Sequence, residues 1–185
     1  MRKAIQVGFF VAAVGAALAA CGRAAAPQDE AQLVSILQRS LEVRATTART
    51  FNMTSFETVF VDEPTVPLTP SQTETVRRMS PGTEPKGFLT FMRVYYEDWA
   101  RGAEHARRVE AAQLASQRPD PIDVAKAVPP RNDPVRIPAI KVLSAVMRGP
   151  DNAYLEAAVD GFLMKVTFVR RDGRWMIAGE TREMR

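Results

Sequence analysis

The sequence predicts an α+β fold in which helices pack on a curved antiparallel sheet of about four strands. Apolar residues recur at helical spacing in two segments, about residues 28–46 and 86–116. From residue 140 onward, apolar and polar residues alternate instead, and turn residues separate the runs. Helices followed by hairpins favour a sheet with one face covered by helix.

The first predicted helix covers about residues 28–46. Acidic residues stand at its start, while Arg39 and Arg44 come later, so its charges complement the helix dipole. We expect its apolar stripe to pack on its own domain rather than on a partner. The stripe consists of Leu33, Val34, Ile36, Leu37 and Leu41.

The next segment, FNMTSFETVFV at 51–61, is rich in Phe, Thr and Val. This composition predicts a strand, and continuation of the helix is the alternative. Proline-rich segments near 62–87 and 117–138 predict loops, with room for short helices near Gln72–Met79 and Ile122–Ala127.

The second long helix is predicted over about residues 86–116, straight or kinked. Its apolar residues fall at positions i, i+3, i+4, i+7 and i+11, which share one helix face. We expect this aromatic stripe to pack in the core, and a ligand pocket is the alternative. The stripe consists of Phe88, Phe91, Met92, Tyr95 and Trp99.

The C-terminal part predicts a meander of four strands, at 140–147, 153–159, 163–169 and from Trp175 onward. Asp-Gly pairs at 160–161 and 172–173 separate the later strands, and this pair favours tight hairpins because both turn residues accept positive φ. In the third strand one face holds Met164, Val166 and Phe168, and the other holds Leu163, Lys165, Thr167 and Val169.

The N-terminus has the three parts of an export signal. Arg2 and Lys3 precede an almost continuous apolar run over residues 4–17, and small residues follow. A retained membrane-spanning helix is the alternative, but a span needs about 20 apolar residues and this run is shorter. We therefore predict that residues 1–20 are a cleaved signal peptide.

The sequence Leu18-Ala19-Ala20-Cys21 resembles the lipobox of bacterial lipoproteins. The resemblance implies cleavage before Cys21, a diacylglycerol on its sulfur and a third acyl chain on its new amino group. An ordinary signal cut nearby is the alternative, but it would leave a lone thiol in an exported protein. Since two acyl chains suffice for stable anchoring, three would make release negligible.

The lipobox also divides the chain. Residues 21–28 are small and polar and predict a lipidated tether, and residues 29–185 predict one α+β domain. Gly22 stands where an Asp tends to retain such lipoproteins at the inner membrane. By resemblance, the expected location is therefore the periplasmic face of the outer membrane.

The net charge gives little support to nucleic-acid binding. The chain has 25 basic and 21 acidic residues, and loss of Arg2 and Lys3 with the signal leaves 23 basic residues and a net charge of +2. This is too weak to indicate a nucleic-acid partner. With its only cysteine lipidated, the domain must be stabilised by its core rather than by disulfides.

The C-terminal part resembles the NTF2-like (cystatin-like α+β) superfamily. The resemblance rests on VTFVRRDGRWMIAGE at 166–180, which contains the last hairpin, and on FMRVYYEDWARG at 91–102. It implies that Trp175 lies at the concave face of the sheet. Some members of the family are ketosteroid isomerases and dehydratases, which use an acidic base together with a tyrosine or acid in a conical pocket.

No catalytic residue can be assigned from the sequence. The family's residue types are present, but none maps onto a catalytic position of the family: Tyr95, Tyr96, Asp98, Tyr154, Glu156 and Asp160. His105 is the only histidine and reads as a surface residue, and no metal-ligand spacing appears. Nucleotide-binding and serine-hydrolase patterns are missing too, so we expect no cofactor.

These observations favour a non-enzymatic interaction or assembly module of the cell envelope, with an envelope protein as partner. A domain that binds a small molecule or lipid is the alternative, and an isomerase-like or dehydratase-like enzyme is a weaker one. In the binding alternative, the pocket would be lined by five aromatic residues: Phe88, Phe91, Tyr95, Trp99 and Trp175.

Palmitate labelling tests the anchor. We expect cells expressing the wild-type chain to incorporate labelled palmitate into the protein, and cells expressing Cys21→Ser to incorporate none, because the sulfur is the acylated atom. Label should be read from the immunoprecipitated protein. Equal label in the two forms would exclude Cys21 as the lipidation site.

Overall fold

The computed structural model describes residues 22–117 and 137–184, and its α+β architecture agrees with the expected fold class. The predicted signal peptide, Cys21 and the short helix near 122–127 lie outside these residues. In chain order the elements are β1 (Arg23–Ala24), α2 (Pro27–Thr50), η1 (Phe56–Thr58), α3 (Pro70–Met79), α4 (Phe88–Gln117), β2 (Ile140–Met147), β3 (Asn152–Val159), β4 (Phe162–Arg171) and β5 (Arg174–Met184).

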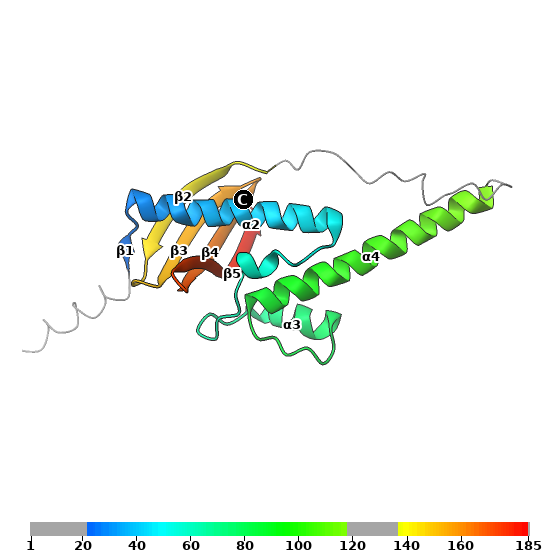
Figure 1. Ribbon diagram of the computed structural model, residues 1–185, viewed down its shortest axis with the longest axis horizontal. Helices are drawn as coiled ribbons and strands as arrows, with labels where there is room; N and C mark the ends of the chain where they lie inside the picture. The colour runs from blue at the N-terminus through cyan, green and yellow to red at the C-terminus, as the bar shows by residue number, and fades with distance from the viewer. Residues whose placement is uncertain (1–21, 118–136, 185) are drawn as a thin grey trace, which may run out of the picture.

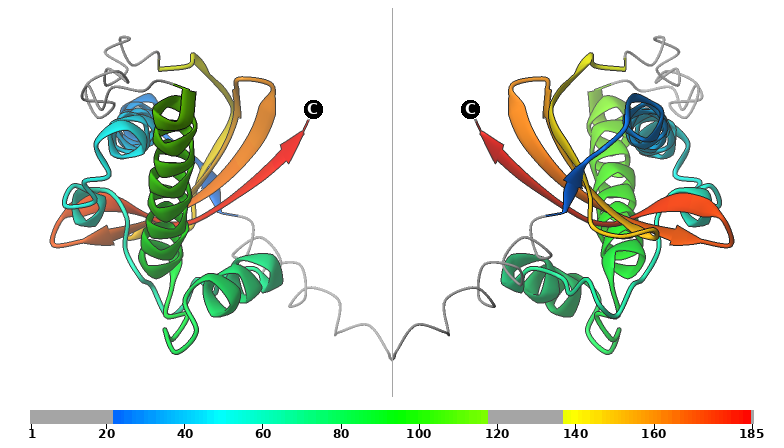
Figure 2. Two further views of the ribbon diagram at one scale, coloured as in Figure 1. Left: turned by 90° about the vertical axis from the view of Figure 1, so that its right-hand side faces the viewer. Right: turned by 90° about the vertical axis from the view of Figure 1, so that its left-hand side faces the viewer.

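The sheet has five strands where about four were expected. Its order is β1-β2-β3-β4-β5, and every neighbouring pair is antiparallel. The additional strand, β1, pairs Arg23 with Met147 and Ala24 with Val146. From residue 22 on, the segment expected to be a tether therefore forms an edge strand and the start of α2. Figure 2 shows the curvature of the sheet.

Both Asp-Gly turns form as expected. Asp160 and Gly161 have φ of 49° and 82°, and Asp172 and Gly173 have φ of 51° and 74°. These positive values give the twist that joins adjacent antiparallel strands through two residues. The predicted strand 140–147 matches β2, and the other strands begin or end within a few residues of their expected limits.

Helix α2 lies across the sheet (Figure 1) and buries Leu33, Leu37 and Val43. Opposite it, Met164, Val166 and Phe168 of β4 enter the same core, as their shared face predicts. On the other face, Leu163, Lys165 and Thr167 are half-buried, and Val169 is buried outside the main core. The helix runs past its expected end, to Thr50, and stops where Phe51 adopts a left-handed φ of 56°.

The strand predicted at 51–61 is wrong. The segment contains the 3-10 helix η1, and within the described residues its backbone pairs with the sheet only at an isolated bridge between Phe60 and Ile177. Its buried residues Phe56, Val59 and Phe60 are spaced as on one helical turn, not in strand alternation. The aromatic and β-branched residues are thus used for core packing at helical spacing.

The segment predicted as a loop at 62–87 is packed against the domain and contains α3, close to the helix expected at 72–79. Asp62 accepts hydrogen bonds from the backbone N–H and the hydroxyl of Thr90, at 2.9 and 2.5 Å. A Cβ at Gly87 would lie 2.7 Å from the Asp62 Cα, so this crossing needs glycine. The buried Glu63 pairs with Arg171 of β4.

Helix α4 matches the second long helix expected from the sequence. Its first half packs on the body of the protein, and its C-terminal half projects beyond it (Figure 1). Among the helices within residues 22–117 and 137–184, none combines the length and apolar character needed to cross a bilayer.

Candidate functional site

A buried ion pair joins α2 to β5. The Arg44 guanidinium donates to both carboxylate oxygens of Glu180, at 2.8 and 2.5 Å, and Arg182 Nε donates to Glu180 Oε1 at 2.7 Å. Arg44 is 6% exposed and Glu180 is 7% exposed. The two-pronged geometry matches the planar guanidinium to the planar carboxylate, which favours one orientation of the helix against the strand.

The pair stays ionised in spite of its burial. Burial by itself raises the pKa of Glu180, but the charges and hydrogen bonds of Arg44 and then Arg182 outweigh it and lower that pKa below its usual value. For Arg44, burial by itself lowers the pKa, and Glu180 outweighs it and raises the pKa. Both groups therefore carry full charge at neutral pH.

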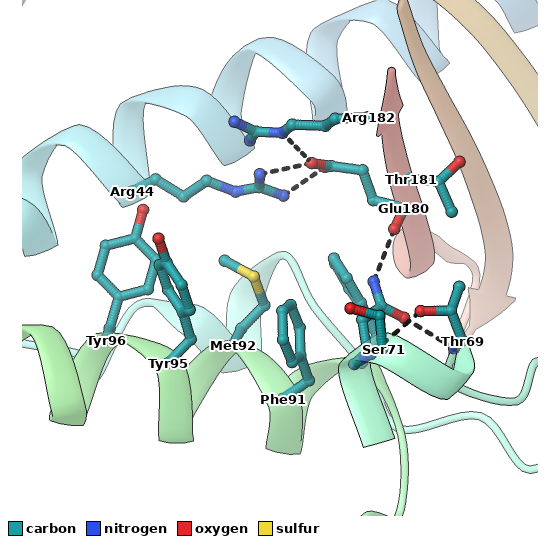
Figure 3. Close-up of a pocket in the computed structure, with 12 residues that line it drawn as sticks. Arg44, Thr69, Ser71, Phe91, Met92, Tyr95, Tyr96, Glu180, Thr181 and Arg182 are labelled. Carbon is teal, nitrogen blue, oxygen red and sulfur yellow. Dashed lines mark hydrogen bonds and ion pairs between the residues drawn. The ribbon is translucent and has the colours of Figure 1, made fainter. Parts of the chain in front are cut away.

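An open cleft of about 490 Å³ lies beside this pair, between α2, the start of α3, α4 and the end of β5 (Figure 3). One wall is apolar and belongs to α4, with Phe88, Phe91 and Met92. The other is polar and comes from Arg44, Glu180 and Arg182, and hydroxyl groups complete the lining: Thr69, Ser71, Tyr95, Tyr96 and Thr181.

The N-terminus of helix α3 lies at the cleft, where a capping box starts the helix and one hydrogen bond ties it to β5. Thr69 Oγ1 accepts from the backbone N–H of Gln72 at 3.2 Å, and Gln72 Oε1 accepts from the backbone N–H of Thr69 at 3.0 Å. This reciprocal pair is a capping box, which starts the helix. The same Gln72 side chain donates through Nε2 to the Glu180 carbonyl at 2.8 Å, and so ties α3 to β5.

Two polar groups at the cleft have hydrogen-bonding capacity left. Arg44 Nε is buried and has no hydrogen-bond partner within the described residues. Burial, partly offset by Arg44 and Arg182, raises the pKa of Tyr96, so its phenol stays protonated and can donate a hydrogen bond. In Figure 3 the hydroxyl ends of Tyr95 and Tyr96 point toward the side of the cleft that carries Arg44.

Three of the five aromatic residues expected to line a pocket do line this cleft: Phe88, Phe91 and Tyr95. The other two lie elsewhere. Trp99 is 44% exposed and packs on Phe51 and Tyr96, with ring centroids 5.8 and 6.2 Å apart. Trp175 is buried at the start of β5, five residues before Glu180, under the Arg170 guanidinium at 4.4 Å.

Sequence reasoning missed the charged residues of the cleft, although a signal for each was present. Arg44 follows Leu33 and Leu37 at helical spacing, so it lies on the buried face of α2. Glu180 lies in a strand whose other buried residues are apolar: Trp175, Ile177 and Ala178. A charged residue at a core-facing position predicts a buried partner, but neither pattern names that partner.

The other titratable residues considered above lie apart from the cleft or at its edge. Tyr154 donates to Glu156 at 3.0 Å on β3, and burial together with this bond raises the pKa of Tyr154 to about 12. Asp160 lies in a turn, Asp98 pairs with Arg101, and His105 is exposed on α4. Within the part of the chain that is described, no three His, Cys, Asp or Glu residues form a potential metal site.

Comparisons of the chain with protein-family models, with curated proteins and with solved structures found no match.

The buried ion pair makes a testable contribution to stability. We expect Glu180→Leu to lower the free energy of unfolding by about 3–5 kcal/mol, because it leaves the Arg44 cation buried without its partner. The double variant Arg44→Met/Glu180→Leu should recover most of this loss, since a packed apolar pair is close to neutral. Glu183→Leu, which breaks an exposed pair with Lys165, is the matched control and should cost less than about 1 kcal/mol. Urea unfolding measures all three, and equal losses for Glu180→Leu and Glu183→Leu would contradict the assignment.

The same pair predicts a loss of stability in acid. The folded-state pKa of Glu180 lies below its ordinary value of 4.5, so its stabilising contribution is complete above that pH. It is lost as the pH falls from 4.5 toward the lower folded-state pKa, where the carboxylate takes up a proton. Urea unfolding between about pH 3 and 7 should therefore show a steeper acid loss in the wild type than in Arg44→Met/Glu180→Leu. Parallel curves would exclude Glu180 as a source of the acid sensitivity.

Proposed function

We propose that this protein is a lipid-anchored component of the cell envelope whose NTF2-like domain binds a small amphipathic ligand with an acidic head group. The lipobox at Leu18–Cys21 supports the anchor and an outer-membrane location facing the periplasm. The order of helices followed by a curved antiparallel sheet, with a helix across one face, supports the NTF2-like assignment.

The observation that carries the binding proposal is the two-sided cleft beside Glu180. Its volume of about 490 Å³ lies within the range of about 300–1,000 Å³ typical of small-molecule sites. Its apolar side follows α4 through Phe88, Phe91 and Met92, and the rest of its lining carries charged, hydroxyl and amide groups. An apolar wall that faces a polar one suits a ligand with a hydrocarbon or aromatic body and one polar end.

The charges of the cleft favour an acidic polar end. Arg44 and Arg182 face a single carboxylate, Glu180, which leaves a net charge of +1. Arg182 is bonded to Glu180 through Nε only, and among the described residues its two terminal nitrogens have no partner. A ligand carboxylate or phosphate can accept from those nitrogens in a charge-assisted hydrogen bond.

The geometry favours binding over catalysis. An acidic base of the isomerase kind needs a raised pKa and an oxygen free to accept a proton. Both oxygens of Glu180 accept from arginines, and the pKa of Glu180 is lowered rather than raised. We therefore assign Glu180 to positioning Arg44 and Arg182, not to proton transfer.

Binding of decanoate and decanol tests this proposal. The two probes share an alkyl chain and differ in charge, so decanoate should raise the melting temperature of the full-length protein more than decanol does. Arg182→Gln should weaken decanoate binding by about tenfold, the value of one charge-assisted hydrogen bond, and leave decanol binding unchanged. Arg174→Gln removes an exposed arginine outside the cleft and is the matched control. Calorimetric titration that finds no binding of either probe, or equal effects of the two variants, would contradict the proposal.

A second candidate function is the interaction module, and the exposed part of α4 favours it. Trp99, in the packed half of α4, is 44% exposed, and Val109, in the half that projects beyond the body (Figure 1), is 43% exposed. Large apolar side chains on a projecting helix are typical of a surface that binds a protein partner.

Crosslinking in intact cells tests the interaction module. A photo-reactive residue at Trp99 should trap a specific envelope protein, and the same residue at Phe162, an exposed position on β4, should not. Absence of any product at Trp99, or the same products at both positions, would count against this candidate.

A further inference from the structure

The N-terminal end of the described chain is fixed to the edge of the sheet. β1 pairs with β2, and just after it the backbone N–H of Ala25 donates to the Ala145 carbonyl at 2.9 Å. Gly22 has a φ of +70°, and a Cβ there would lie 2.6 Å from a Val146 methyl carbon and 2.7 Å from the Met147 carbonyl oxygen. The chain is thus packed against β2 from Gly22 on, with no free spacer between this residue and the domain.

This packing determines which part of the domain is next to the proposed anchor. Cys21 is bonded to Gly22, so their Cα atoms are about 3.8 Å apart. Acyl chains on Cys21 would therefore begin within one residue of the β2 edge. A flexible tether would let the domain rotate freely, whereas a lipid anchor on Cys21 would bring the turn between β2 and β3 close to the membrane surface.

That turn carries a basic cleft, which we define by Gly22, Arg23, Asp29, Arg148 and Arg170. Three arginines and one aspartate line it, for a net charge of +2, and within the described residues none of the three arginines forms an ion pair. Arg148 lies over the Tyr154 ring at 5.1 Å and Arg170 over the Trp175 ring at 4.4 Å. Arg170 Nε is in addition buried without a hydrogen-bond partner.

The aromatic rings position the guanidinium groups of Arg148 and Arg170 without neutralising their charge. Stacking on a ring holds an arginine in place and leaves its outer N–H groups free for an anion. Guanidinium groups bind phosphate oxygens in two-pronged hydrogen bonds, and basic groups next to an anchor are attracted to anionic lipid. The cleft therefore has the charge, the donors and the location that lipid phosphate requires.

We propose that the basic cleft binds the phosphate groups of anionic phospholipids and sets the orientation of the domain on the membrane. This inference rests on the proposed anchor at Cys21. The expected ligand is lipid phosphate of the surrounding bilayer, because Gly22, the residue next to the proposed anchor, lines the same cleft. The β2–β3 turn then faces the bilayer.

A quenching experiment on the full-length lipidated protein tests this orientation. The protein is placed in phosphatidylcholine vesicles with or without phosphatidylglycerol, together with a lipid that carries a nitroxide on its head group. A fluorophore is attached at Pro150→Cys in the turn, or at the matched control Glu74→Cys. Glu74 is exposed on α3, which is bonded to the middle of β5 through Gln72 and Glu180 and does not line the basic cleft.

We expect the label at position 150 to be quenched several-fold more than the label at position 74, and more strongly when phosphatidylglycerol is present. Arg23→Gln/Arg148→Gln should return the quenching at position 150 to its value in pure phosphatidylcholine. Equal quenching at the two positions, or no effect of the double substitution, would overturn the proposal.

Three further outcomes separate this inference from related possibilities. Inorganic phosphate that binds the detergent-solubilised protein at the cleft, while the label at position 150 stays unquenched on vesicles, would indicate a free-anion site and overturn the membrane assignment. Failure of the protein to float with the vesicles would show that the anchor is missing. This result would end the proposal of a lipid anchor and, with it, the proposed orientation on the membrane. Protein that floats with its turn unquenched would end only this one.

Discussion

The bidentate ion pair between Arg44 and Glu180 is the interaction on which the candidate site depends. It joins residues 136 positions apart and holds the first helix against the last strand. Because both groups are buried and charged, each needs the other, and the helix has little freedom to shift along the sheet. The candidate ligand cleft is the space beside this pair, and polar groups, among them the pair itself, line it.

The two clefts differ in chemistry. The cleft beside Glu180 combines aromatic side chains of α4 with two arginines and one carboxylate, which suits an amphipathic acid. The cleft that contains Arg23 and Arg148 is basic and next to the position of the proposed anchor. The two clefts share no lining residue, so under both proposals the membrane and the ligand occupy separate parts of the surface.

Local sequence predicted the elements well where the pattern was regular. The Asp-Gly turns, β2 and α4 agree with expectation because turn chemistry and hydrophobic period act over a few neighbouring residues. The strand expected at 51–61 does not form. The prediction relied on the composition of the segment, whereas the spacing of Phe56, Val59 and Phe60 is that of a helical turn. Strand β1 was not predicted because two residues are too few to show a hydrophobic period. It forms because the edge of β2 provides its pairing partner.

By itself the sequence determined the α+β class, the two Asp-Gly turns, the two long helices and the aromatic face of α4, since each depends on adjacent residues or on a short hydrophobic period. It contained Arg44 and Glu180 at core-facing positions but not their pairing, because nothing local relates two residues on different elements. Only the tertiary structure brought them together, moved Trp99 and Trp175 out of the expected pocket, and placed Gly22 against β2. Those contacts arise when the helices pack on the curved sheet, and packing depends on the whole chain at once.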